Sequence, residues 1–158
     1  MLTTVTTATP PAVFLHLVVG YDGSPPASRA LDAAVRLLQD RPGRIDVVYV
    51  AHLSSLAMLS PGAIAEIESD FDEIEQQLRT AAAEQLRDRG AAWEFERRQG
   101  IVPEELTAMA MAIGDTDSDP GSTVAIVVGS SSHATHRVVG SVAVSLARHS
   151  PVPLIIVP

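Results

Sequence analysis

Two short segments of the chain carry residue types suited to binding a phosphate. The first is Gly20-Tyr21-Asp22-Gly23-Ser24, in which a carboxylate lies in a glycine turn just before a predicted helix. The second starts at Gly129-Ser130-Ser131-Ser132 and continues to Gly140-Ser141, before another predicted helix. Small residues let backbone N–H groups approach an anion closely, and a helix N-terminus adds its dipole. Both segments therefore predict a site for a phosphate-bearing ligand.

Strands must position these segments, because each segment follows an apolar run. Five short runs rich in β-branched residues alternate with segments of helical period, a pattern typical of β-α-β units in a parallel sheet. The runs cover residues 13–20, 45–51, 92–98, 124–129 and 154–157. In open parallel sheets the ligand lies beyond the carboxyl ends of the strands, where the winding reverses. We therefore expect a cleft between Asp22 and the segment 129–141.

Four helices are expected between and after these runs. The first follows a Ser24 cap with Pro25 in its first turn, and the second runs from about residue 61 to 89, where Gly90 stops it. The third starts near Pro103, and the fourth follows Gly140-Ser141. In the run 92–98, aromatic residues alternate with charged ones, which predicts an edge strand with one face partly wet.

Composition excludes several classes of function. The chain has 158 residues, no Cys, no Lys and a net charge of −8, so it is the size of one domain and cannot use a Schiff-base lysine, a Walker lysine or a thiolate. The acidic balance argues against binding nucleic acid. No apolar run approaches the ~20 residues that cross a bilayer. We expect a cytoplasmic protein with a flexible tail over residues 1–12 and one domain over residues 13–158.

Four motifs stand at the expected strand ends. They are Val18-Val19-Gly20-Tyr21-Asp22-Gly23-Ser24; Val48-Tyr49-Val50-Ala51-His52; Gly100-Ile101-Val102-Pro103; and Val127-Val128-Gly129 with Gly140-Ser141-Val142 and Pro151-Val152-Pro153. Together they resemble the motifs of the universal stress protein family, over about residues 15–157. The resemblance implies an α/β fold, a single-domain three-layer sandwich whose five-stranded parallel sheet has the order 3-2-1-4-5 and carries helices on both faces. It also implies a role in stress response.

Many members of that family bind ATP through Gly-x2-Gly-x9-Gly-Ser/Thr after the fourth strand, and others lack this motif and do not bind it. Gly129 matches its first glycine, and Gly140-Ser141 matches its last pair. Ser132 stands where the second glycine belongs, and the seven residues 133–139 replace nine. A serine at a position that requires positive φ is strained. Against that, three serine hydroxyls and Arg137 can replace lost phosphate contacts.

The resemblance also assigns individual roles. Asp22 matches an aspartate near the ribose and metal end of the ligand, and Val50 matches a residue that meets the adenine. The implied nucleotide site comprises Asp22, Val50, Gly129, Ser131, Ser132, Arg137, Gly140 and Ser141, for ATP with Mg²⁺ and without a tightly bound cofactor. Two simpler roles stay open: Asp22 as a turn residue, and Gly140-Ser141 as a helix start with a serine cap.

Other chemistry is less well supported by the residues. His133 and His136, with His52 or Asp22, have the residue types of a metal site, but loop histidines are more often solvated. The serines 130–132 lack a nucleophile elbow and an oriented base. We predict no catalytic residue and no metal site, and expect any ATP hydrolysis to be slow or absent because neither a tuned base nor a lysine is present.

The last apolar run, 154–157, lies at a sheet edge in the family order, where its unpaired backbone favours pairing with a second copy. We therefore expect a homodimer through Leu154–Val157. The leading hypothesis is a regulatory module that binds an adenine nucleotide. The alternative is a dimeric interaction protein without a nucleotide, favoured by Ser132 and the short loop. A third, an adenylating enzyme, lacks its expected Ser-Gly-Gly-x-Asp-Ser or His-x-Gly-His signature.

Overall fold

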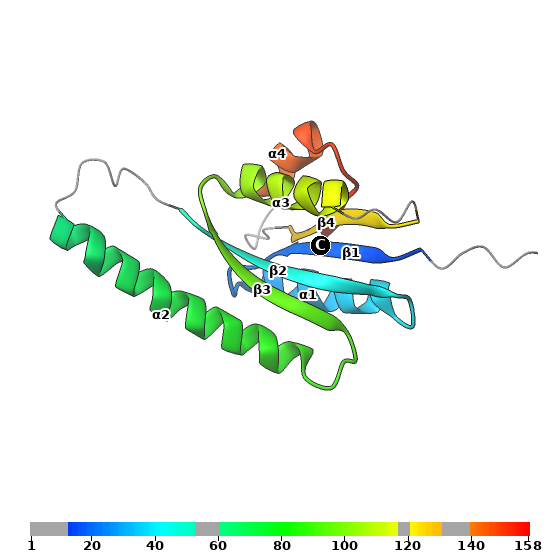
Figure 1. Ribbon diagram of the computed structural model, residues 1–158, viewed down its shortest axis with the longest axis horizontal. Helices are drawn as coiled ribbons and strands as arrows, with labels where there is room; N and C mark the ends of the chain where they lie inside the picture. Colours follow the sequence, from blue (N-terminus) through cyan, green and yellow to red (C-terminus); the bar gives the residue numbers. More distant parts are fainter. Residues whose placement is uncertain (1–12, 53–60, 117–120, 131–139) are drawn as a thin grey trace, which may run out of the picture.

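The computed structural model describes residues 13–52, 61–116, 121–130 and 140–158, with only the backbone described at residues 61 and 63–66. Strands and helices alternate through these residues, as the apolar runs predict (Figure 1). The elements are β1 (Leu15–Gly20), α1 (Pro25–Leu38), β2 (Gly43–Ala51), α2 (Pro61–Leu86), β3 (Ala92–Gln99), α3 (Val102–Thr116), β4 (Thr123–Gly129), α4 (Ser141–His149) and β5 (Leu154–Val157). The expected tail, 1–12, lies outside the described residues.

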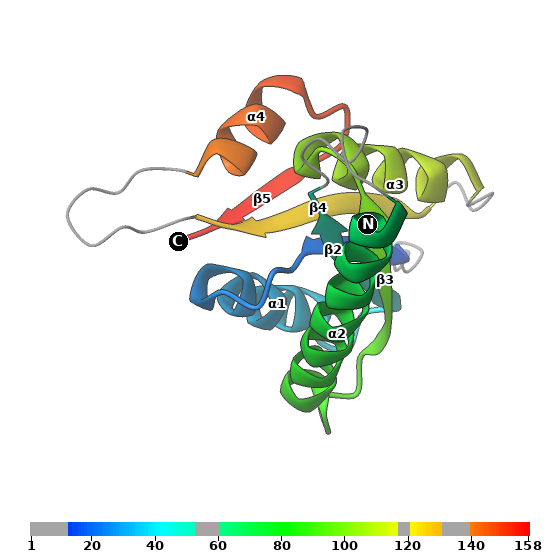
Figure 2. The same ribbon diagram turned by 90° about the vertical axis from the view of Figure 1, so that its left-hand side faces the viewer.

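The strands form one parallel sheet in the order β3-β2-β1-β4-β5, which confirms the expected order. The central strand β1 pairs with β2 on one side and β4 on the other. Helices α1 and α2 cover one face, and α3 and α4 cover the other (Figures 1 and 2). The fold is therefore the expected α/β sandwich, and it places the carboxyl ends of β1 and β4 side by side.

Alternate strand residues enter two separate cores. Leu17, Val19 and Val47 pack toward α1 and α2, whereas Val18 and Val48 pack toward α3 and α4. Both faces of β1 and β2 are thus covered over most of their length, which explains why their sequences are nearly continuous apolar runs.

The edge strand β3 has two unlike faces, as its alternating sequence predicts. Phe95 is buried, and the Arg79 guanidinium of α2 lies 4.9 Å from the centre of its ring. Glu94 and Glu96, on the opposite face, are exposed. One face of β3 is therefore dry and the other wet.

Two helix ends differ from expectation. Helix α2 ends at Leu86 rather than at residue 89, because Asp88 (φ 61°) already adopts a left-handed conformation before Gly90 (φ 69°). The serine cap expected for the fourth helix is wrong. Gly140 is the N-cap of α4, Ser141 is its first helical residue, and no side chain of a described residue caps this turn. At α1 the prediction is confirmed, since the Ser24 hydroxyl accepts a hydrogen bond from the Ala27 N–H at 3.3 Å.

Candidate functional site

A cavity of about 240 Å³ opens at the carboxyl edge of the sheet, where β1, β2 and β4 end. The first turns of α1, α3 and α4 complete its walls. Five of the eight residues predicted for the site line it: Asp22, Val50, Gly129, Gly140 and Ser141. Ser131, Ser132 and Arg137 lie outside the described residues. The fold thus brings both candidate segments to one edge, where parallel sheets bind their ligands.

One side of the cavity is an apolar slot made by β2, β4 and α3. Its side chains are Val48, Val50, Val102, Leu106 and Val128. Leu106 is fully buried, and Gly20 of β1 leaves room for it, because a Cβ at Gly20 would lie 3.1 Å from Leu106 Cδ1. Such a slot accepts a flat apolar ring and disfavours a charged group.

The Asp22 side chain lies exposed at the mouth of the cavity. Its Oδ1 accepts a hydrogen bond from the Ser24 N–H at 3.0 Å, which makes the local turn that the simpler interpretation expects. This bond holds the carboxylate in place and uses one of its two oxygens. Oδ2 makes no hydrogen bond to any described residue, so a ligand hydroxyl or a hydrated cation can reach it.

The N-terminus of α1 also borders the cavity, but its first-turn N–H groups are either absent or already hydrogen-bonded. Pro25 and Pro26 have no N–H group. The next amide, that of Ala27, donates to the Ser24 hydroxyl, and the Ser28 amide donates to the Ser24 carbonyl at 2.9 Å. Helix α1 therefore has no first-turn amide for an anion.

The N-terminus of α4, on the opposite wall, has first-turn N–H groups without an acceptor in the helix. The helix begins with the bond from the Val144 N–H to the Gly140 carbonyl at 3.0 Å. The amides of Ser141, Val142 and Ala143 come before that bond and have no acceptor within the helix. Among the described residues, no side chain caps them, and all three residues line the cavity. An anion at this turn would meet three donors and the positive end of the helix dipole.

Gly129 has a packing role that its place in the motif does not reveal. A Cβ at this position would lie 2.3 Å from the Pro26 carbonyl oxygen and 2.7 Å from the Pro26 Cβ. The end of β4 therefore touches the backbone of α1 directly. This contact leaves no room for a side chain at position 129 and sets the distance between β4 and the N-terminus of α1.

The predicted site left out several wall residues, among them Tyr49, Val102 and Leu106. Val102 belongs to a recognised motif, but nothing in its spacing indicates a contact with the slot. Burial raises the pKa of the Tyr49 hydroxyl, and Arg97 opposes the shift only in part. The Tyr49 side chain packs toward α1 and α2, on the sheet face opposite the slot, so its hydroxyl does not point at the slot.

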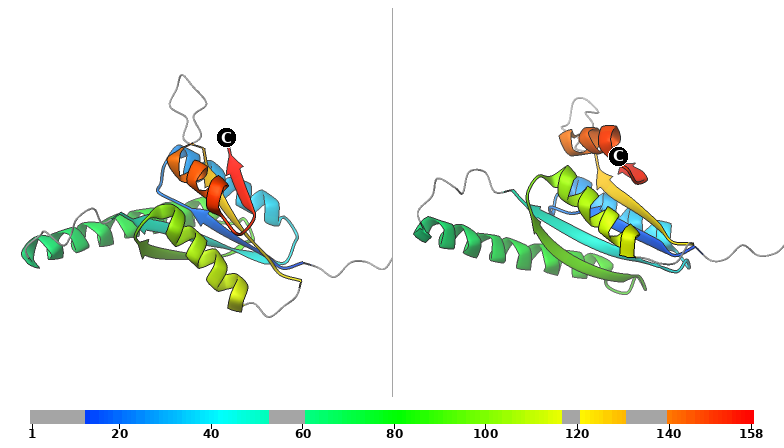
Figure 3. Two further views of the ribbon diagram at one scale, coloured as in Figure 1. Left: turned by 90° about the horizontal axis from the view of Figure 1, so that it is seen from above. Right: turned by 45° about the horizontal axis from the view of Figure 1, so that its top comes forward.

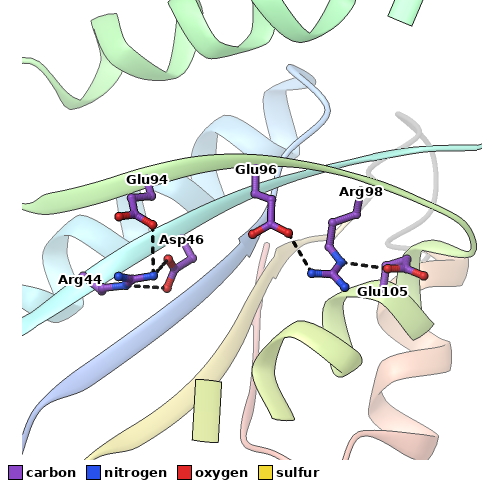
Figure 4. A network of polar contacts seen from close by, with 6 residues as sticks. All are labelled: Arg44, Asp46, Glu94, Glu96, Arg98 and Glu105. Atoms are coloured by element: carbon purple, nitrogen blue, oxygen red, sulfur yellow. Dashed lines mark hydrogen bonds and ion pairs between the residues drawn. The ribbon is translucent and has the colours of Figure 1, made fainter. Parts of the chain in front are cut away.

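An ion pair fixes the start of α3, and with it the wall of the slot (Figure 4). Arg98, near the end of β3, donates from Nε to Glu105 at 2.9 Å and from Nη1 to Glu96 at 2.9 Å. Glu105 precedes Leu106 in the first turns of α3. The pair thus joins the edge strand to the helix that supplies Val102 and Leu106.

A second charge cluster lies on the same sheet face toward the amino ends of the strands (Figure 4). Arg44 donates to Asp46 from Nε at 3.2 Å and from Nη2 at 2.5 Å, and it reaches Glu94 at 3.3 Å. Asp46 is only 1% exposed. The bond to Asp46 raises the pKa of Arg44, against a smaller effect of burial.

This second cluster borders a groove of about 640 Å³ beside the carboxyl-terminal part of α3. Phe14, His16 and Met109 contribute apolar surface to it, and Arg44 and Arg98 contribute charge. Both guanidinium groups already have carboxylate partners. The groove is therefore larger than the carboxyl-edge cavity but has fewer uncommitted polar groups.

Within the described part of the chain, no three His, Asp or Glu side chains gather into a metal-binding group. His133 and His136 lie outside that part. A search of the described helices for one long and apolar enough to cross a bilayer finds none.

Comparison with known proteins identifies one family by sequence and several similar folds by structure. The sequence model of the universal stress protein family matches residues 14–158. No curated protein matches the chain. Among solved structures, universal stress protein UspA from Lactobacillus plantarum superposes with a TM-score of 0.73 at 21% identity, over 93% of this chain and 99% of that one.

Two other solved structures carry nucleotides. The universal stress protein from Archaeoglobus fulgidus in complex with dAMP has a TM-score of 0.56 and 20% identity, over 92% of this chain and 98% of that one. A universal stress protein family protein from Arabidopsis thaliana with AMP bound has a TM-score of 0.58 and 12% identity, over 90% of each chain. At these identities the likeness shows the fold.

Proposed function

Because the chain belongs to the universal stress protein family, we propose that it is a stress-response module that binds an adenine nucleotide in the carboxyl-edge cavity. One observation carries the proposal: an apolar slot and a helix N-terminus with uncommitted amides face each other across a single cavity. A nucleotide has the matching ends, a flat base and an anionic phosphate. The dAMP and AMP complexes of the two similar structures support the same ligand class.

The two helix N-termini determine how the ligand would be oriented. The phosphate would lie at α4, because the first-turn amides of α1 are absent or already bonded. The base would enter the slot between Val50 and Leu106, and Asp22 would face the sugar. In this pose each polar end of the ligand meets a donor or acceptor that has no other partner among the described residues.

Electrostatics bear on which nucleotide is held. Asp22 is the only charged side chain among the described residues that line the cavity. A triphosphate would therefore gain from a bound Mg²⁺, which keeps several waters and needs one or two carboxylates besides the phosphates. Asp22 is the described residue able to hold it. We propose ATP with Mg²⁺ as ligand and the cytoplasm as location, and no residue is proposed for catalysis.

Calorimetric titration of dialysed protein with ATP and Mg²⁺, and separately with AMP, tests the proposal. We expect micromolar binding. Ser141→Pro removes one first-turn amide at a position where proline suits a helix, and we expect it to weaken binding about tenfold or more. Ser141→Ala, which removes only the hydroxyl, is the matched control and should bind more tightly than Ser141→Pro.

Asp22 is tested in the same way. Asp22→Asn should weaken binding of ATP with Mg²⁺ more than binding of AMP, since it removes the proposed cation ligand. Asp32→Asn removes an exposed carboxylate that pairs with Arg89 on the outer side of α1 and should change neither. Silence up to millimolar nucleotide, from protein shown to carry none, would refute the proposal and favour an interaction protein without a nucleotide.

We also propose a homodimer through β5. This strand pairs with β4 on one side and has no described strand on the other. The Pro153 carbonyl accepts a hydrogen bond from the Ile126 N–H, and the Val157 carbonyl accepts one from the Ser130 N–H. Because successive residues of a strand point their backbone groups to opposite sides, those of Ile156 point to the open edge. Light scattering should give a dimer at micromolar concentration, Ile156→Pro should give a monomer, and Ile156→Val should stay dimeric. A monomeric wild-type chain would contradict this.

A further inference from the structure

We propose that the amino-terminal half of α2 is a docking surface for a basic amphipathic helix of a partner protein. Helix α2 has 26 residues and is about 39 Å long, whereas β2, on which it packs, has 9 residues and is about 30 Å long. The helix therefore runs beyond the carboxyl edge of the sheet, away from the body of the domain (Figures 1 and 3).

The overhanging half carries an apolar face that lies outside both cores: Ile74 is exposed, and Ile67 and Phe71 are partly exposed. Leu78 packs against the core beneath α1 and α2, and residues farther along the helix are buried there. Ile67, Phe71 and Ile74 continue the same stripe at helical spacing, yet they belong to neither core. Ile74 is 39% exposed. We call Ile67, Phe71 and Ile74 the α2 stripe.

Acidic residues flank the α2 stripe. Residues 67–77 contain five carboxylates and no basic residue. Asp72 and Glu75 pair with Arg97 of β3, so part of this charge is neutralised within the domain. Asp70 and Glu73 are exposed and form no ion pair with a described residue. This surface is therefore a partly exposed apolar stripe bordered by uncompensated negative charge.

Charge decides which occupant fits. Two copies of this half-helix would bring ten carboxylates and no basic residue together, in a chain whose net charge is already −8. A helix with a Leu or Ile face bordered by Lys or Arg would instead cover the stripe and pair with Asp70 and Glu73. Helices that bind this way read a partner at i, i+4 and i+7, the spacing of the α2 stripe.

The test uses the full chain and a synthetic four-turn peptide of Leu and Lys placed at amphipathic helical spacing. Fluorescence anisotropy of the labelled peptide should give micromolar affinity. Ile74→Ser, and separately the double variant Asp70→Lys/Glu73→Lys, should each weaken binding at least about tenfold. The control Glu84→Lys/Glu104→Lys makes the same change in net charge at exposed positions outside the stripe, and should weaken binding much less.

Three outcomes would overturn the proposal. Equal binding of a Leu and Glu peptide would show that charge does not select the partner. Equal loss in the control variant would show that only net charge matters. Absence of binding at millimolar peptide, or self-association of the wild-type chain that Ile74→Ser abolishes, would show that the chain itself or a second copy occupies the stripe.

Discussion

The carboxyl-edge cavity and the amino-end groove share one sheet face and one helix, α3, but differ in chemistry. The groove is larger, at about 640 Å³ against about 240 Å³. In the groove, each arginine has carboxylate partners; in the cavity, the first-turn amides of α4 have none among the described residues. Volume alone therefore does not favour the groove as a binding site. Polar groups without partners favour the cavity instead.

The difference in chemistry between the cavity and the groove follows from the residues on one face of β2. Arg44, Asp46, Val48 and Val50 follow one another at alternate positions, so the face changes from charged to apolar halfway along the strand. At the amino end, the charges pair with each other. At the carboxyl end, the valines form an apolar slot. The polar groups of the cavity come instead from the N-terminus of α4, in the helix layer above the sheet.

The largest expected effect is at the amino end. Arg44→Met leaves the Asp46 carboxylate buried without its ion pair, and we expect the free energy of unfolding to fall by about 2–3 kcal/mol. We place the loss at the lower end for a buried pair because the Arg44 side chain is 34% exposed. Urea denaturation measures it, and the double variant Arg44→Met/Asp46→Leu should recover most of the loss. A loss below about 1 kcal/mol would show that the pair is not structural.

An intermediate effect is expected at the carboxyl end. Val102→Glu puts a carboxylate in the slot and should weaken nucleotide binding about tenfold. The fold should tolerate the change, because an acidic residue at the first position of α3 interacts favourably with the helix dipole. Ala112→Glu is the matched variant on the same helix, at the groove, and should leave affinity unchanged in calorimetry. If both variants bound nucleotide equally well, the slot would not hold the base.

The smallest expected effect is at an exposed charge of the groove. Glu96 is 47% exposed and pairs, among the described residues, with Arg98 alone, which also pairs with Glu105. Glu96→Gln should therefore change the free energy of unfolding by no more than about 0.5 kcal/mol in urea denaturation. A loss of unfolding free energy as large as that of Arg44→Met would mean that exposed and buried ion pairs contribute equally to stability.

The fold was predictable because its strong signals are local and agree with one another. The apolar runs of β1, β2 and β4 mark buried parallel strands, and the alternation in β3 marks an edge. Helix ends were less predictable. Asp88 takes a left-handed conformation that its residue type tolerates but does not require, so the sequence pattern placed the end of α2 at Gly90 instead.

The site was predictable only where chain order implies proximity. Asp22 and Gly129 follow adjacent strands, so their meeting could be predicted from the strand order. Val102 and Leu106 reach the cavity through the docking of α3, which rests on its buried residues Leu106, Met109 and Ala110 and on the pair of Arg98 with Glu105. These contacts between distant elements have no periodic signal in the sequence. The contact of Gly129 with Pro26 is likewise invisible in the sequence, because it depends on backbone approach between distant elements.

The central position of β1 also governs how the protein folds. The cavity draws its walls from residues as far apart as Gly20 and Ala143, so it is absent until the two halves of the chain have paired on either side of β1. Contacts of such long range slow folding. A ligand held there binds the native state alone and shifts the folding equilibrium of the whole chain by mass action. Ligand concentration in the cell would thereby set the lifetime of this protein against proteolysis.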